Sequence, residues 1–151
     1  MRCLPLFLLL CLATAPAVAA DWKAVGSTEK GHAVCGLSLT LEDKDKRFEL
    51  RYAAGAETFS VALARADWRI AQDPAHEAML RFDGHAPWTV TLVKGGFTLP
   101  VEQLGRFVLE FRDSNTFTVL VRVAPPTGWA ASLVGSGVAG DGFLECSRPL
   151  I

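Results

Sequence analysis

Two cysteines are the residues of this chain whose chemistry is most sharply defined. The chain has four cysteines, but Cys3 and Cys11 lie in an N-terminal segment that we expect to be removed on export, which leaves Cys35 and Cys146. Two thiols in an oxidising compartment are expected to pair. A catalytic thiol is the disfavoured alternative, because neither cysteine has a second thiol nearby, and His32, three residues before Cys35, would point to the opposite face of a strand. The sequence therefore predicts a Cys35–Cys146 disulfide.

The export prediction rests on the first twenty residues. Arg2 supplies a positive start, residues 4–12 are almost wholly apolar, and Ala17-Val18-Ala19 offers small residues at a cleavage site. The apolar run is far shorter than the ~20 residues that a membrane-spanning helix needs. We expect residues 1–20 to be a signal peptide and residues 21–151 to be a single β domain, periplasmic or secreted, with no membrane insertion after cleavage.

The histidines do not form a recognisable metal motif. His76 and His85 flank one expected strand, and Glu77 and Asp83 stand near them, so a mixed nitrogen and oxygen site can be imagined. The chain has no His-x-His, no His-Glu-x-x-His and no paired thiolate motif. We expect no metal and no cofactor.

Catalytic patterns are equally weak. Ser136 sits between two glycines but lacks the Gly-x-Ser-x-Gly nucleophile elbow. The carboxylate pairs, Glu42/Asp43 and Asp141/Glu145, lie in charged or terminal segments with nothing to bury them and raise their pKa. The glycine-rich run 135–142 lacks the lysine of a phosphate-binding loop. We do not expect an enzyme.

One tryptophan is a candidate for contact with a partner. Trp88 and Trp129 each share a face with aliphatic neighbours, which favours core packing. Trp68 stands between Asp67 and Arg69 and could instead be an exposed anchor. We take Trp68 and Arg69 as the candidate partner-binding residues, with core packing of Trp68 as the alternative.

Alternation of apolar and polar residues defines the elements that must position these groups. Expected strands cover 32–41, 48–52, 59–63, 68–70, 80–82, 88–92, 107–111, 117–123 and 129–133. Turn signals stand at 42–47, 53–56, 83–84, 95–96 and 113–115. The pattern predicts a mostly β chain, either an antiparallel β-sandwich or a partly closed barrel. Four sets should face one core: Phe59/Val61/Leu63, Trp88/Val90/Leu92, Phe107/Leu109/Phe111 and Phe117/Val119/Val121.

Helical structure is expected only in short pieces. Pro100 to Gly105 is consistent with a single helical turn. Residues 136–146 favour a short C-terminal helix capped by Ser136, with Ala139 and Phe143 on its inner face. Two glycines weaken that helix by about 1 kcal/mol each relative to alanine, so a loop is the alternative.

The order of features also resembles known proteins. These features are an early Trp22, the Cys35 strand, Asp-Trp-Arg-Ile at 67–70, Phe-Asp-Gly at 82–84, and a final Gly-Ser before Cys146. Together they resemble a group of small uncharacterised exported proteins of α-proteobacteria. More distantly, they are similar to the invasion-associated locus B family. The resemblance covers most of the chain from Trp22 to Cys146. It implies a β-sandwich and a role in the cell envelope, and it supplies no catalytic residues.

The net charge limits the classes of partner that we expect the chain to bind. A net charge of −1 lacks the basic excess of a nucleic-acid binder and argues against electrostatic docking on an anionic membrane. We expect a non-catalytic binding domain that recognises a protein or envelope component through a sheet face or edge. A secreted inhibitor that blocks an enzyme such as a lysozyme or protease with a rigid loop is the alternative.

Overall fold

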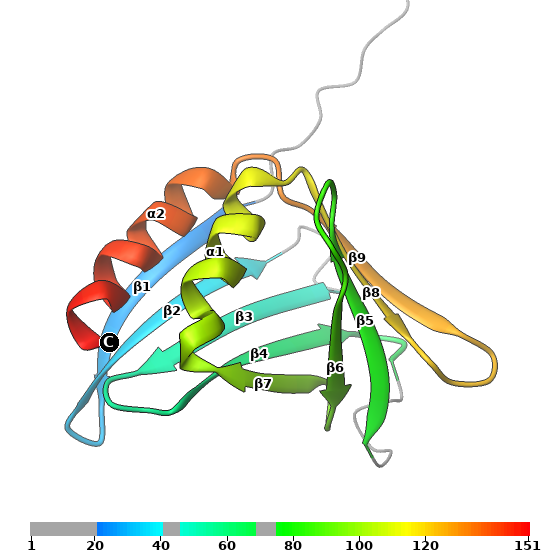
Figure 1. Ribbon diagram of the computed structural model, residues 1–151, viewed down its shortest axis with the longest axis horizontal. Helices are drawn as coiled ribbons and strands as arrows, with labels where there is room; N and C mark the ends of the chain where they lie inside the picture. Colours follow the sequence, from blue (N-terminus) through cyan, green and yellow to red (C-terminus); the bar gives the residue numbers. More distant parts are fainter. Residues whose placement is uncertain (1–20, 41–45, 69–74) are drawn as a thin grey trace, which may run out of the picture.

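The computed structural model describes residues 21–40, 46–68 and 75–151, which form two antiparallel sheets and two helices (Figure 1). The five-stranded sheet has the order β1 (Asp21–Glu29), β2 (His32–Thr40), β3 (Lys46–Ala53), β4 (Thr58–Arg65), β7 (Gly96–Pro100). The four-stranded sheet has the order β6 (Trp88–Leu92), β5 (His76–Phe82), β8 (Thr116–Val121), β9 (Thr127–Ser132). The helices are α1 (Leu104–Asp113) and α2 (Ser136–Ser147), with 3₁₀ turns at Val101–Gln103 and Arg148–Leu150. The proposed signal peptide lies outside the described residues.

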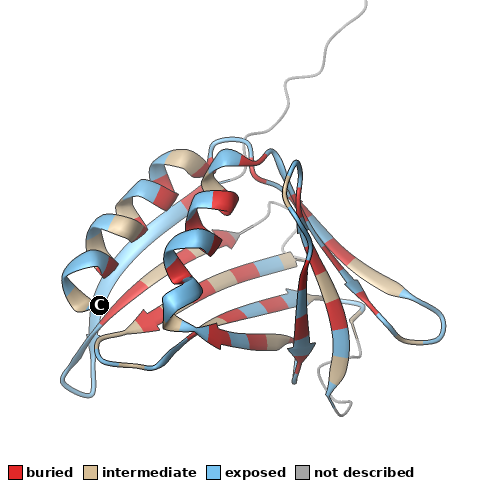
Figure 2. Ribbon diagram, viewed as in Figure 1, coloured by how far each residue is buried: buried red, intermediate tan, exposed pale blue. Residues whose placement is uncertain are grey.

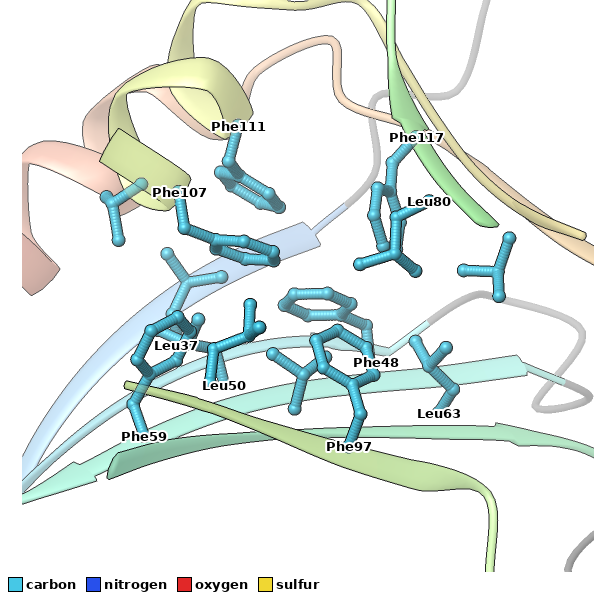
Figure 3. Packing of buried hydrophobic residues seen from close by; sticks show 14 of the residues in the cluster. Leu37, Phe48, Leu50, Phe59, Leu63, Leu80, Phe97, Phe107, Phe111 and Phe117 are labelled. Atoms are coloured by element: carbon cyan, nitrogen blue, oxygen red, sulfur yellow. The ribbon is translucent and has the colours of Figure 1, made fainter. Parts of the chain in front are cut away.

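The two sheets enclose one apolar core. Side chains alternate between buried and exposed along the strands (Figure 2), as period-two geometry requires. Three of the four expected sets are buried throughout: Phe59/Val61/Leu63, Trp88/Val90/Leu92 and Phe117/Val119/Val121. Aromatic rings from both sheets and from α1 meet in the middle (Figure 3). The prediction of a mostly β antiparallel sandwich with a C-terminal helix is confirmed.

The expected strand at 107–111 is wrong, because this segment is helix α1. Phe107 and Phe111 are buried, but Leu109 is 43% exposed. The buried positions of α1 are Leu104, Phe107, Val108, Glu110 and Phe111, a spacing of three and four that belongs to a helix. The Phe-x-Leu-x-Phe pattern satisfied a strand as well, and burial between the sheets decided between the two. Phe107 contacts rings from both sheets: Phe59, Phe82, Trp88 and Phe97.

Strand β7 is a second difference between the structure and the sequence-based expectation. The strand that begins at Trp88 ends before Gly95, as expected, but the turn then carries the chain directly into a strand of the other sheet. Val93 and Gly96 exchange backbone hydrogen bonds of 2.7 and 3.0 Å, and Lys94 and Gly95 both have positive φ, as a tight two-residue turn demands. Gly96 then begins β7, which pairs with β4. The expected helical turn after Pro100 is present and continues into α1.

Two boundaries also move. Lys46 and Arg47, expected in a turn, begin β3. Trp68 lies just after β4 and outside any strand, so the expected strand at 68–70 is not formed at its described residue; Arg69 and Ile70 lie outside the described residues.

Helix α2 confirms the favoured interpretation of 136–146, and Ala139 and Phe143 are buried on its inner face. The expected cap is wrong: Gly135, with φ 88°, occupies the N-cap, and the buried Ser136 hydroxyl lies 3.5 Å from the Phe111 carbonyl oxygen. A Cβ on Gly142 would lie 3.1 Å from the Cβ of Ala24. This glycine lowers helix propensity but lets α2 approach β1 closely.

The predicted disulfide is confirmed. Cys35 of β2 and Cys146 of α2 are bonded, with Cα atoms 5.8 Å apart and a sequence separation of 111. Helix α2 packs on β1, β2 and α1 (Figure 1). The disulfide therefore attaches the C-terminal helix to the sheet near its β1 edge.

The Asp-Gly hairpin between β5 and β6 is also confirmed, and its aspartate holds a second turn in place. The Asp83 carboxylate accepts hydrogen bonds from the backbone N–H groups of Thr116, at 2.6 Å, and Asn115, at 2.8 Å. These bonds, with the Thr116 amide contributing most, lower the pKa of Asp83 below its ordinary value. The hairpin thereby fixes the chain where α1 ends and β8 begins.

A carboxylate with a lowered pKa stabilises the folded state above the unfolded pKa, and that contribution is lost as pH falls through the folded pKa. We expect Asp83→Ala to lower the melting temperature by a few degrees near neutral pH. The difference in melting temperature between this variant and the wild type should disappear as the pH is taken below about 3.9, the pKa of an aspartate in the unfolded chain. Calorimetry from about pH 7 to about pH 2 measures it. Asp83→Asn, which keeps the shape and removes the charge, should lack this pH dependence; a constant gap between wild type and Asp83→Ala would contradict the assignment.

Candidate functional site

A basic groove runs along the outer face of the four-stranded sheet, beside the edge strand β9. It has a volume of about 450 Å³. Its outward-facing lining residues come from β5, β8 and β9, joined by two cations from the five-stranded sheet: Lys46, Arg65, Met79, Arg81, Thr118, Leu120, Gly128 and Ala130. We call this set the basic groove.

The floor of the groove is apolar, and the strand register explains why. Alternation along β5 turns Leu80 inward and Met79 outward. Met79 pairs directly with Leu120 of β8, and Leu120 pairs in turn with Gly128 of β9. Because Gly128 has no side chain, it leaves Leu120 uncovered on that side, and Leu120 is 51% exposed.

Two cations form the rim by bonding to the backbone of β9. Arg65 donates to the Gly128 carbonyl oxygen at 2.7 Å, and Lys46 donates to that of Ala130 at 3.3 Å. In the opposite direction, the Trp129 indole N–H of β9 donates a hydrogen bond of 3.0 Å to the Ala64 carbonyl oxygen of β4. Since unpaired carbonyls on an edge strand invite pairing with another chain, these bonds block the β9 edge and fix two positive charges beside it.

The electrostatics of the groove are positive. Asp67, just outside it, binds Arg65 through two contacts of 2.5 and 2.6 Å, and the hydrogen bond from Arg65 lowers the pKa of Asp67. Arg81 is exposed on the opposite side of the floor. No acidic side chain lines the groove among the described residues, so three cations face one acid at the rim.

Of the two candidate partner-binding residues, one can be placed. Trp68 is half-buried against the core, and its indole N–H donates to the Thr127 hydroxyl at 3.2 Å. Its backbone N–H donates to the Arg65 carbonyl oxygen. Trp68 therefore supports the Arg65 side of the rim, next to the start of β9. Arg69 lies outside the described residues.

The lining residues themselves were not singled out from the sequence. Lys46 was assigned to a turn, and Arg65 and Arg81 belonged to no motif. One signal was present: Leu120 stands at an outward position between Thr118 and Arg122, where alternation expects a polar residue. The approach of Lys46 and Arg65 from the other sheet has no signature in the sequence.

Other side chains that could carry chemistry lie outside the basic groove. Buried Glu110 accepts hydrogen bonds from the Trp88 indole at 2.6 Å and from Arg106 at 2.7 Å, and the Arg106 guanidinium lies 4.3 Å from the Trp88 ring centroid. His76 begins β5, and His85 lies in the β5–β6 turn. In the part of the chain that the structure describes, no three His, Cys, Asp or Glu side chains gather in a way that could hold a metal ion.

No family model, curated protein or solved structure matches this chain. Among the described residues, neither helix has the length and apolar character needed to cross a membrane.

Proposed function

We propose that this protein is an exported, non-catalytic binding domain whose basic groove docks an acidic, partly apolar segment of a protein or envelope partner. The observation that carries the proposal is the arrangement of Lys46, Arg65 and Arg81 around the exposed Met79–Leu120 floor. Positive side chains select acidic residues, and the floor offers a site for one or two apolar side chains of the same segment.

Preorganisation supports this assignment. Arg65 is already held by Asp67 and by the Gly128 carbonyl, and Lys46 by that of Ala130. Side chains that are fixed before binding lose little conformational freedom when a partner arrives. The floor lies on regular strands rather than on a loop, which keeps its geometry constant.

Export is part of the proposal and is supported by the N-terminal sequence and the Cys35–Cys146 disulfide, since disulfides persist in oxidising compartments. The resemblance to the invasion-associated locus B family, which implies a role in the cell envelope, also favours export. Binding through a sheet face is favoured over inhibition by a protruding anchor, because Trp68, the candidate anchor, is half-buried and hydrogen-bonded to Thr127.

A synthetic peptide, acetyl-Glu-Glu-Leu-Leu-Glu-Glu-amide, is a suitable probe. We expect it to bind, and we expect Arg81→Glu to weaken the affinity by about tenfold or more, because a repulsive charge replaces an attractive one at the groove. Arg47→Glu is the matched control: Arg47 is exposed on the outer face of the other sheet, and this change should alter affinity by less than about twofold. Two-dimensional NMR titration reports both the affinity and the residues that shift.

In the same titration, the lysine counterpart of the peptide should not bind. The proposal is wrong if the acidic peptide leaves the resonances of Met79, Leu120 and Ala130 unmoved, or if Arg47→Glu weakens binding as much as Arg81→Glu does.

A further inference from the structure

Strand β1 is an edge strand: among the described residues, no strand pairs with it on the side away from β2. It has nine residues and ends the five-stranded sheet, where it pairs with β2 along its whole length. Only Trp22 of these nine is buried. Strand β1 contains no proline, and its pairing with β2 runs without a bulge. Of the features that protect an edge from pairing, it carries charged side chains such as Lys23 but neither a proline nor a bulge.

The register identifies which backbone groups of β1 are available. Ala54 donates its N–H to the Ala33 carbonyl, so the odd-numbered residues of β2 bond to β3 and the even-numbered ones bond to β1, because antiparallel partners alternate. Gly36 pairs with Val25, which turns the backbone groups of odd-numbered β1 residues toward β2. The N–H and C=O groups of Trp22, Ala24, Gly26 and Thr28 therefore point away from the sheet.

The other edges differ from this one. The β9 edge is blocked by Arg65 and Lys46, while β6 and β7 have five residues each and are joined by a tight turn. Within the described residues, β1 is thus the one edge that is long, regular and open. Such an edge pairs readily with another strand.

We propose that a second copy of this chain occupies the β1 edge, through antiparallel pairing of β1 with β1 about a two-fold axis at Gly26. In this register Gly26 exchanges two backbone hydrogen bonds with Gly26 of the second copy, and Ala24 exchanges two with Thr28 on either side. These are the residues whose backbone groups point outward. The two five-stranded sheets then become one continuous sheet.

Charge selects this register over its neighbours. With the axis at Gly26, Lys23 lies opposite Glu29 of the second copy, twice by symmetry, and opposite charges across a non-hydrogen-bonded pair attract. With the axis at Val25, Asp21 would face Glu29, and these like charges repel. An axis at Ala24 pairs as many of the nine residues as an axis at Gly26, but it sets no opposite charges against each other, and an axis at Thr28 pairs fewer.

The helices permit the same arrangement. Helix α2 packs on both β1 and β2 (Figure 1), and we take its axis to lie over the gap between these two strands, about half a strand spacing inside the edge. Adding a strand spacing of about 4.8 Å between the two copies places the two α2 helices about 10 Å apart. This matches the usual packing distance of about 8–10 Å between helix axes. The edge can close without displacing α2.

Sedimentation of the mature protein tests the proposal. We expect a dimer at about 100 μM, and we expect Thr28→Pro to be monomeric, because proline removes an outward N–H that is not used within the sheet and is tolerated at edges. Thr28→Ala keeps that N–H and should remain dimeric. A wild-type protein that stays monomeric, or a Thr28→Pro variant that dimerises as well as Thr28→Ala, overturns the proposal.

Charge exchange tests the register without proline. Lys23→Glu and Glu29→Lys should each weaken dimerisation by about tenfold, because each places like charges opposite one another. The double variant should regain most of the wild-type affinity. Glu29 also pairs with Arg51 within the sheet, so recovery in the double variant, rather than loss in either single one, carries the result. A double variant weaker than both single variants rules out the Gly26 register.

Discussion

Replacing Phe107 by alanine should lower the free energy of unfolding by about 3–5 kcal/mol, the range for removing a buried aromatic ring. Phe107 is fully buried, and its ring centroid lies 5.2 to 6.3 Å from those of four others, drawn from both sheets. Figure 3 shows Phe107 together with two of these four, Phe59 and Phe97. Because these four rings come from both sheets, removing the Phe107 ring leaves a cavity between the sheets. Urea unfolding followed by circular dichroism measures the change.

Leu109→Ala is the matched control. In a strand, Leu109 would share a face with Phe107 and its removal would also be costly. In α1 it is 43% exposed, and its truncation should change stability by less than about 1 kcal/mol. Equal losses for the two variants would show that Leu109 packs in the core as Phe107 does, which a strand would require and α1 does not allow.

Removing the disulfide should have a comparable effect. The Cys35–Cys146 bond closes a loop of 111 residues, for which chain entropy estimates about 4.7 kcal/mol. Strain and residual structure in the unfolded chain reduce such values, so we expect the Cys35→Ala/Cys146→Ala variant to lose about 2–5 kcal/mol. Domains of this kind have about 5–15 kcal/mol in total, so the variant should be close to unfolding at physiological temperature.

The double variant is preferred because a single substitution leaves a reactive thiol. Reduced wild-type protein should match its stability, which separates loss of the bond from loss of the cysteine side chains. Thiol titration of native and denatured protein supplies the independent check. Two free thiols per chain in protein purified from an oxidising compartment would show that the bond is not formed.

The sequence by itself determined the elements whose burial follows from local pattern. In strands such as β4 and β8, apolar and polar residues alternate because one face is buried and the other is exposed. Phe117, Thr118 and Val119 show this alternation in β8. The Asp83-Gly84 turn was predictable because few residues accept its backbone angles. The disulfide was predictable from counting cysteines in a chain whose N-terminal sequence predicts export.

Only the tertiary structure decided the rest. Phe107, Leu109 and Phe111 fit a strand or a helix equally, and the space between two sheets selected the helix. Strand β1 gave no signal, because an edge strand that is exposed on both faces, with only Trp22 buried, shows no alternation. The basic groove requires Lys46 and Arg65 of one sheet to reach the β9 backbone of the other. Arg65 and Gly128 are 63 positions apart in the sequence, and Lys46 and Ala130 are 84 positions apart. Contacts over such separations depend on how the sheets pack, and no local pattern encodes them.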